Sequence, residues 1–194
     1  MPGLGIVIPR AGGGGVPIQT YAIHTSDNFT GTDGSITNRV LNNALGGGAS
    51  ATWIGNSGGV FGIGSNRLYR LGGTTSASVV GFAMPQADYA VYAKILAIPT
   101  GTAPLRLMAR RTVISGGTDH SITINGSGTA TGNISFVVGD VLGIRVTGTL
   151  IEYIKNDVVY GTATASILTA GFAGIACATN STFELDDFVV RIPS

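Results

Sequence analysis

From residue 46 to its C-terminus, the chain alternates between short apolar runs and breaks rich in glycine, asparagine and aspartate. The runs include ATWIG, GVFGIG, NRLYRLG, SASVVGFAM and HSITINGSG. Short strands at regular spacing are typical of a β-sandwich or barrel, whereas βαβ proteins place helical segments between their strands. The pattern therefore predicts a single all-β domain with no second core.

Glycine supplies many of the breaks, since it accounts for 31 of the 194 residues, about twice the usage of roughly 7% in average proteins. The glycines follow no collagen period, so we expect turns, bulges and bends. In IKNDVVYG, the Asn-Asp pair predicts a hairpin with strands Leu150–Lys155 and Val158–Thr162. The segment SITNRVLNNAL, residues 35–45, is the one place where we expect a helical turn.

The segment LRLMARRTV, which begins at residue 105, alternates in the manner of a strand with two different faces. Its two predicted faces are Leu105, Leu107 and Ala109 on one side, and Arg106, Met108 and Arg110 on the other. We expect Arg106, Arg110 and Arg111 to form a small basic face, which either meets solvent or contacts an acidic neighbouring subunit.

Charge and hydropathy limit the partners of the chain. Hydrophobic residues make up 44%, enough for a sizeable core, but charged residues make up only 11%, against about 25% in a typical soluble domain. This low charge suggests that partners or further copies cover much of the surface, so we expect a homo-oligomer. With 11 Lys+Arg against 10 Asp+Glu, there is no excess positive charge for binding nucleic acid. No apolar run approaches the roughly 20 residues of a membrane span.

The single cysteine and the residues at the N-terminus indicate the cellular compartment of the protein. The chain has one cysteine, Cys177, which cannot form an internal disulfide and is expected to be a small buried strand residue. The N-terminus shows no basic segment followed by an apolar segment, so no signal peptide is predicted. We expect a protein that is made in the cytoplasm and is not secreted.

Residues 1–20 are predicted to be an extended arm that precedes a domain at residues 21–194. Prolines and four consecutive glycines exclude a helix there. Fixing such a chain costs about 1–2 kcal/mol per residue, so we expect the arm to lie against another subunit or a neighbouring protein. The alternative is an arm that folds onto its own domain or stays mobile. The expected contact residues are Leu4, Ile6, Ile8, Arg10, Gly12 and Gly15.

Three segments together resemble a known family: SDNFTGTDGSITNR, GGVFGIGSNRLYR and TFELDDFVVR. The combination is similar to the concanavalin A-like (laminin G/glucanase-type) jelly rolls of tailed-phage virion structural proteins. The resemblance covers approximately residues 25–194 and leaves out the arm. It implies a two-sheet antiparallel jelly-roll β-sandwich whose first and last strands are neighbours. It also implies binding, decoration or adhesion on a virion.

The acidic segment near the C-terminus is the candidate for an enzymatic role. Laminarinase-like enzymes of the family carry several carboxylates on one strand, with a nucleophile and an acid/base about 5–5.5 Å apart. Here Glu184 and Asp186 are predicted to share a strand face, but Phe188, Val189 and Val190 occupy the positions of the third carboxylate. We therefore expect no enzyme, with a glycoside hydrolase as the least favoured alternative.

No cofactor is expected, although a structural calcium ion is a possible exception. Jelly rolls of this kind often join the opening turn to the closing strand through calcium, which binds about six to eight oxygens. The candidates are Asp27, Asp33 and Asp187, with Asp186 beside them. The favoured alternative is that these aspartates cap turns.

Other polar and aromatic residues show no recognisable site. His24 and His120 have no neighbouring histidine or cysteine in the sequence, so neither a zinc site nor a catalytic triad is predicted. Five aromatic residues are candidates for sugar stacking, although packing in the core or on a sheet face is the more usual role. They are Trp53, Tyr69, Tyr89, Tyr92 and Tyr153.

These observations lead to one preferred function and one alternative. The preferred function is a phage virion structural protein, that is, a capsid decoration protein, head fibre, or tail fibre or spike subunit. It would be located in the virion, attached to other capsid or tail proteins through its arm, with strand addition by residues 3–8 as one route. The alternative is a carbohydrate-binding module that recognises a glycan on the host surface.

Overall fold

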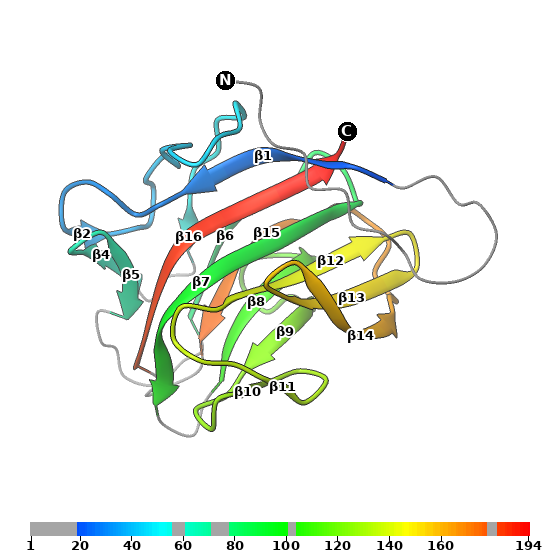
Figure 1. The fold of residues 1–194 in the computed structure, drawn as a ribbon. Coiled ribbons are helices and arrows are strands. Elements are labelled where there is room, and N and C mark those ends of the chain that lie inside the picture. The colour runs from blue at the N-terminus through cyan, green and yellow to red at the C-terminus, as the bar shows by residue number, and fades with distance from the viewer. Residues whose placement is uncertain (1–18, 56–60, 71–77, 101–103, 178–181) are drawn as a thin grey trace.

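Two antiparallel β-sheets pack face to face in the computed structural model of this protein (Figure 1), which describes residues 19–55, 61–70, 78–100, 104–177 and 182–194. Within these ranges there is no helix, and so none that could cross a membrane. The strands are β1 (Tyr21–Asp27), β2 (Gly34–Ser35), β3 (Ile54–Gly55), β4 (Phe61–Gly64), β5 (Arg67–Arg70), β6 (Ser78–Ala83), β7 (Tyr89–Thr100), β8 (Leu105–Arg111), β9 (His120–Ile124), β10 (Thr129–Ala130), β11 (Ile134–Ser135), β12 (Val141–Thr147), β13 (Leu150–Lys155), β14 (Val158–Thr164), β15 (Phe172–Cys177) and β16 (Thr182–Pro193).

The larger sheet has nine strands in the described residues, in the order β14-β13-β12-β7-β16-β5-β4-β2, with β1 also paired to β16. Strands β7 and β16 run along each other at its centre and are the longest, with 12 residues each. The other edge of β16 pairs first with β5 and then with β1. The smaller sheet has seven strands in the order β11-β10-β9-β8-β15-β6-β3.

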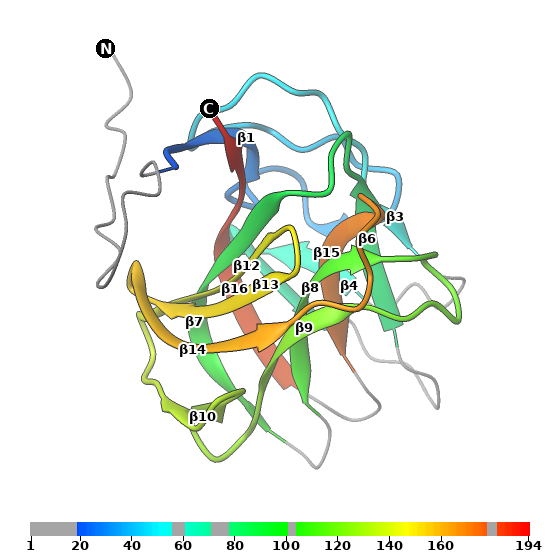
Figure 2. The same ribbon diagram turned by 90° about the vertical axis from the view of Figure 1, so that its right-hand side faces the viewer.

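The first and last strands are neighbours, as the sequence predicts. Strand β1 pairs antiparallel with β16 from Tyr21 opposite Pro193 to Asp27 opposite Phe188, and the two strands lie side by side in Figure 1. Figure 2 shows β7 and β16 of one layer beside β8 and β15 of the other. The predicted all-β jelly-roll sandwich with two antiparallel sheets is therefore confirmed.

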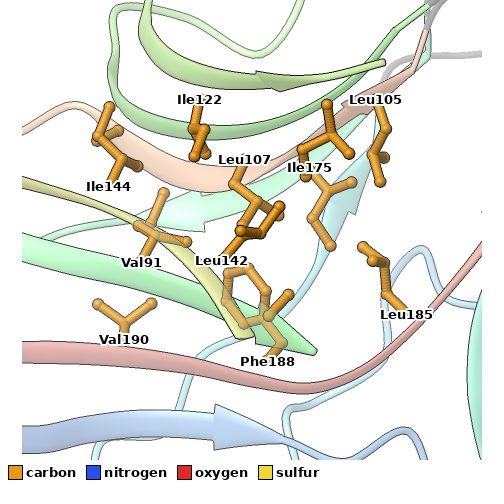
Figure 3. Close-up of a cluster of buried hydrophobic side chains, with 14 of the residues drawn as sticks. Val91, Leu105, Leu107, Ile122, Leu142, Ile144, Ile175, Leu185, Phe188 and Val190 are labelled. Carbon is orange, nitrogen blue, oxygen red and sulfur yellow. The ribbon is translucent and has the colours of Figure 1, made fainter. Parts of the chain in front are cut away.

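The hydrophobic core lies between the sheets, where alternate side chains of both layers meet (Figure 3). The larger sheet contributes Val91, Leu142, Ile144, Leu185, Phe188 and Val190, and the smaller sheet contributes Leu105, Leu107, Ile122 and Ile175. Trp53 packs edge-on against Phe82 and Phe188, with ring centroids 5.3 and 5.0 Å away. Cys177 is buried in the same core, as predicted.

The structure confirms part of the alternation that the sequence predicts for β8. Leu105, Leu107 and Ala109 all belong to the main core, whereas Met108 packs in a small cluster on the opposite face. The expected solvated basic face is wrong, however, because Arg110 is fully buried. Its backbone has a φ of +51°, and the pairing of β8 with β15 shifts register beside it. This bulge turns the side chain out of the alternation that the sequence predicts.

The predicted hairpin is confirmed, and its second strand extends two residues further, to Thr164. Asn156 and Asp157 form the turn with φ values of 49° and 63°, as expected of a turn that matches the twist of the two strands. The helical turn expected at residues 35–45 is wrong. Asn38 and Asn43 have positive φ there, and apart from one turn bond, from the N–H of Arg39 to the carbonyl of Ile36, the backbone of the segment bonds to neighbouring loops and strands.

Candidate functional site

The larger sheet has one face toward the core and one face away from it, and the second face carries many of the charged groups. Strand alternation produces this separation: on β16, Leu185 and Val190 enter the core, whereas Glu184, Asp186 and Arg191 do not. We call this second face the outer face, with Tyr21, Arg67, Tyr92, Lys94, Arg145, Glu152, Glu184, Asp186, Asp187 and Arg191.

One half of the outer face is a cluster of aromatic rings and arginines. The ring of Tyr92 lies on the backbone of β12, so close to Gly143 that a Cβ added there would lie 2.3 Å from its Cδ1. The guanidinium of Arg191 covers the same ring at 4.9 Å from the centroid. Tyr92 is therefore only 4% exposed, and burial raises the pKa of its hydroxyl to about 12 despite the nearby positive charges.

Arg145 occupies the centre of this cluster. Its Nε donates to Oε2 of Glu152 at 2.5 Å, and its guanidinium lies 5.3 Å from the centroid of the Tyr21 ring. The Tyr21 hydroxyl forms a 2.7 Å hydrogen bond with the Thr147 hydroxyl. Burial alone would lower the pKa of Arg145, but the hydrogen bond and charge of Glu152 outweigh this effect and raise it. Arg191 is likewise paired, 3.3 Å from Asp157.

The other half of the outer face is acidic. Glu184 and Asp186 share a strand face, as predicted, but Glu184 is ion-paired to Arg67 at 2.5 Å. Asp186 accepts a 2.8 Å hydrogen bond from the backbone of Asp187, which itself lies 3.9 Å from Lys94. Burial is the largest of the effects that raise the pKa of Asp186. Glu184 therefore has a cationic partner, and the carboxylates of Glu184 and Asp186 both accept a hydrogen bond from within the chain.

The structure does not bring the three calcium candidates into one site. Asp27 is fully buried and accepts hydrogen bonds from Trp53 Nε1 at 2.9 Å and from the backbone of Phe29 at 2.8 Å. Asp33 lies in an exposed turn, and Asp187 faces Lys94. Nowhere in the described ranges do three His, Cys, Asp or Glu side chains gather in a way that could hold a metal ion. The contacts of Asp27 instead match the turn-capping role.

The remaining sequence candidates occupy structural positions. Trp53 and Tyr89 are fully buried in the core, so neither ring is open to a sugar. Tyr153 packs against the same core, and Tyr69 is half-buried beside Gly64. His120 accepts a 3.0 Å hydrogen bond from the backbone of Ile167.

All three arginines of the expected basic face have partners within the chain. The carboxylate of Asp119, which is itself only 4% exposed, lies 2.5 Å from Arg111 and 3.6 Å from Arg106. Arg110 donates to three backbone carbonyls and to Asp88. The expected arm contacts at Leu4, Ile6, Ile8, Arg10, Gly12 and Gly15 lie outside the described residues.

The sequence did not single out the centre of the outer face. The site candidates from the sequence do not include Tyr21, Arg145, Glu152 or Arg191. Even so, VLGIRVT and FVVRI each place one arginine in an otherwise apolar strand. An isolated charge in such a strand indicates a partner on a neighbouring strand, because an unpaired charge is costly on a covered surface. That signal identifies Arg145 and Arg191 but not their partners.

A second feature is an open depression of about 430 Å³ where β1 begins and β16 ends. Its lining residues are Gln19, Gln86, Ala87, Asp88 and Pro193. The carboxylate of Asp88 already accepts hydrogen bonds from Arg110 at 3.0 Å and from the backbone of Gly148 at 2.9 Å. Since its charged group is engaged, this depression offers a ligand little more than amide groups and apolar surface.

Neither a protein-family model nor a curated protein sequence matches this chain. Solved structures do match. The endo-β-1,3-glucanase of Pyrococcus furiosus superposes with a TM-score of 0.55 at 12% identity, over 91% of this chain and 96% of the glucanase. A Bacillus subtilis protein of unknown function with a galectin-like fold gives 0.52 at 8%, over 90% and 100%. The carbohydrate recognition domain of Emp47p gives 0.51 at 8%, over 93% and 100%.

The fold is therefore the concanavalin A-like lectin/glucanase jelly roll. At these identities the likeness concerns the fold alone. The matching structures include both an enzyme and a carbohydrate recognition domain, so they leave the activity of this chain open.

Proposed function

We propose that this chain is a non-catalytic adhesion subunit of a tailed-phage virion, such as a capsid decoration protein, a head fibre, or a tail fibre or spike subunit. It attaches to capsid or tail proteins through residues 1–20 and holds the jelly roll on the particle. The support comes from the three sequence segments that resemble such proteins and from the internally paired charges of the outer face.

The pairing of the outer-face charges is the observation that carries the proposal. Glycoside hydrolysis needs two carboxyl groups poised around a sugar, one of them protonated. Here Arg67 holds Glu184, and Glu152 is bound to Arg145. One aromatic ring of the same face, Tyr92, is covered by Arg191. A face whose charges and ring are satisfied within the chain suits a structural role better than catalysis.

Removing the arm tests the proposal. A chain that lacks residues 1–17 should fold but fail to join particles, because the apolar segment at residues 3–8 would no longer add as a strand to a neighbouring protein. The matched control replaces residues 1–17 with a glycine-serine linker of the same length and should fail equally. Incorporation of either variant at the level of the wild-type chain, measured by mass spectrometry of purified particles, overturns the proposal.

A carbohydrate-binding module is the second candidate. The observation that favours it is the half-buried ring of Tyr21, which lies next to Arg145 on the outer face and offers a ring and a hydroxyl. One structure with the same fold is a carbohydrate recognition domain. Micromolar or tighter binding on a glycan array, lost in Tyr21→Ala, would favour this function over adhesion to virion proteins.

A further inference from the structure

The larger sheet ends at β14, a seven-residue strand whose outer edge has no partner strand in the described residues. Strand β14 pairs with β13 on one side only, and five of its seven residues are exposed. An edge strand presents unpaired N–H and C=O groups that can bond to another strand. The edge of β14 is therefore a surface on which a further strand can be added.

The other ends of the sheets are protected against such pairing. Strands β2, β3 and β11 each consist of only two residues, too few to guide a second chain. Strand β1 is long, but the loop after β2 covers it, since Asn43 donates to the carbonyl of Ser26, and Gly48 and Ala49 both donate to the carbonyl of His24. Among the described strands, β14 is the one long edge without such cover.

The sequence of β14 also lacks the charges and prolines that prevent pairing, although its pairing with β13 shifts register at Tyr160, where a bulge leaves one residue without a partner on β13. Natural edge strands carry lysine, other charges or proline, whereas β14 reads VVYGTAT and has none of them. The nearest lysine, Lys155, does not point along the edge. It folds back to donate to the carbonyl of Ser135 at 2.9 Å, and its Nζ covers the Tyr160 ring at 5.3 Å. In the part of the chain that the structure describes, no strand covers the edge of β14, and β14 itself carries no charged residue.

Exposed apolar side chains gather at one end of this strand. Val158 and Tyr160 are 56% and 52% exposed on β14 itself. Val137 and Val138, 65% and 55% exposed, lie on the turn before Asp140, whose carboxylate is 3.8 Å from Lys155. Four large apolar groups at one corner of a sheet are more typical of a contact surface than of a solvated edge.

We propose that β14 pairs antiparallel with β14 of a second copy of this chain, across a two-fold axis, to form one continuous sheet. A second copy fits because residues 158–164 carry no charge, so two such strands meet without repulsion. An antiparallel arrangement also places the Lys155 and Asp157 end of one strand beside the Thr164 end of the other. A parallel arrangement would place the two Lys155 side chains together, which like charges disfavour.

This inference goes beyond the proposed function and does not depend on it. It concerns the association of the chain with itself and would hold for an adhesion subunit and for a carbohydrate-binding module alike. The arm is not needed for it, so a chain without residues 1–17 should associate in the same way. Failure of the β14 contact and failure of the arm to anchor a particle are therefore separate results.

The test compares the mass of purified chain in solution before and after charge is placed on the edge. We expect the wild-type chain to approach twice 19.6 kDa in sedimentation equilibrium over a concentration series. Two-fold pairing about the middle of β14 puts Tyr160 opposite Thr162. The double variant Tyr160→Lys/Thr162→Lys then places like charges face to face and should raise the dimer dissociation constant by about tenfold or more.

The matched control places the same charge on exposed apolar sites away from β14. Val40 and Val113 are 54% and 51% exposed, so Val40→Lys/Val113→Lys should dimerise as the wild type does. A monomeric wild-type chain, or a β14 variant with unchanged dimerisation, overturns the proposal. If the β14 variant fails to fold, hydrogen exchange on the wild-type chain decides whether β14 pairs with a second copy. Protection of the amides of residues 158–164 must rise with protein concentration, and its absence contradicts the proposal.

Discussion

Nε1 of Trp53 donates a 2.9 Å hydrogen bond to Oδ2 of Asp27, and both side chains are fully buried. Asp27 ends β1 in the larger sheet, and Trp53 directly precedes β3 in the smaller sheet. The bond therefore joins the two layers through a polar contact in the middle of aromatic packing. A buried carboxylate of this kind is tolerated only because its oxygens have donors.

Removing the carboxylate should destabilise the fold. In Asp27→Ala, the indole N–H of Trp53 and the backbone N–H of Phe29 lose their acceptor while they remain buried. We expect the free energy of unfolding in urea to fall by about 2–4 kcal/mol. Asp27→Asn keeps an acceptor oxygen and should cost less. An equal cost for both variants would show that the hydrogen bonds are not the source of the stability.

The same residue predicts a pH dependence. Burial raises the pKa of Asp27 above the 3.8 of an unperturbed aspartate, and its hydrogen bonds and the charge of Arg39 offset only part of this effect. The folded state then binds the proton more tightly than the unfolded state. The contribution of this group to stability is therefore fully present below pH 3.8 and is lost as the pH rises through the folded-state pKa.

We accordingly expect the unfolding free energy of the wild type, measured relative to Asp27→Asn, to decrease from acidic to neutral pH. The variant is the internal reference because it lacks the titrating group. If the relative stability of the wild type increased instead, the attraction of Arg39, 3.4 Å away, would outweigh burial.

Arg110 should be among the most sensitive positions of the domain. Its guanidinium donates to the carbonyls of Ala87, Gly148 and Ile167 at 2.7–2.9 Å and lies 3.0 Å from Asp88. Arg110→Met keeps most of the aliphatic stem but leaves these acceptors without their donor. We expect a loss of about 3 kcal/mol or more in urea unfolding.

The matched control for this variant is Arg67→Met. Arg67 forms an ion pair with Glu184 at 2.5 Å, shorter than the 3.0 Å pair of Arg110, but its side chain is 47% exposed, so we expect a loss of at most about 1 kcal/mol. Similar losses for the two variants would contradict the role assigned to the buried bonds of Arg110.

Gly143 tests the arrangement of the outer face. A Cβ at this position would meet Cδ1 of Tyr92 at 2.3 Å and the carbonyl of Val91 at 2.9 Å. Gly143→Ala should therefore lower the free energy of unfolding by about 1–3 kcal/mol through overpacking. At Gly48 an added Cβ has nothing within 4 Å, so Gly48→Ala should cause no loss. A neutral Gly143→Ala would mean that Tyr92 does not lie on β12.

Much of the fold follows from the sequence because its signals are local. The Asn156-Asp157 turn and the alternation of Leu105, Leu107 and Ala109 predict the hairpin and one core-facing strand, and both are confirmed. The segment resemblance predicts that β1 and β16 pair, which their register confirms. The jelly roll is thus largely determined by short patterns.

The errors come from backbone geometry that residue patterns do not encode. A bulge at Arg110 reverses the direction expected for its side chain, and positive φ at Asn38 and Asn43 replaces the expected helical turn. The outer face does not follow from the sequence for a related reason. The Arg145–Glu152 pair forms across β12 and β13, and the Arg191–Asp157 pair joins β16 to the turn between β13 and β14. These partners become neighbours only once the sheet register is set.

The central claim, attachment of the jelly roll to a virion through its arm, is tested most directly by transferring the arm. Residues 1–20 are fused to an unrelated monomeric fluorescent protein and supplied during infection, and purified particles are assayed for fluorescence. The account predicts that the fusion copurifies with particles and competes with the wild-type chain, whereas the carrier alone does not. A fusion that stays out of the particles, while the chain lacking residues 1–17 still enters them, would contradict it.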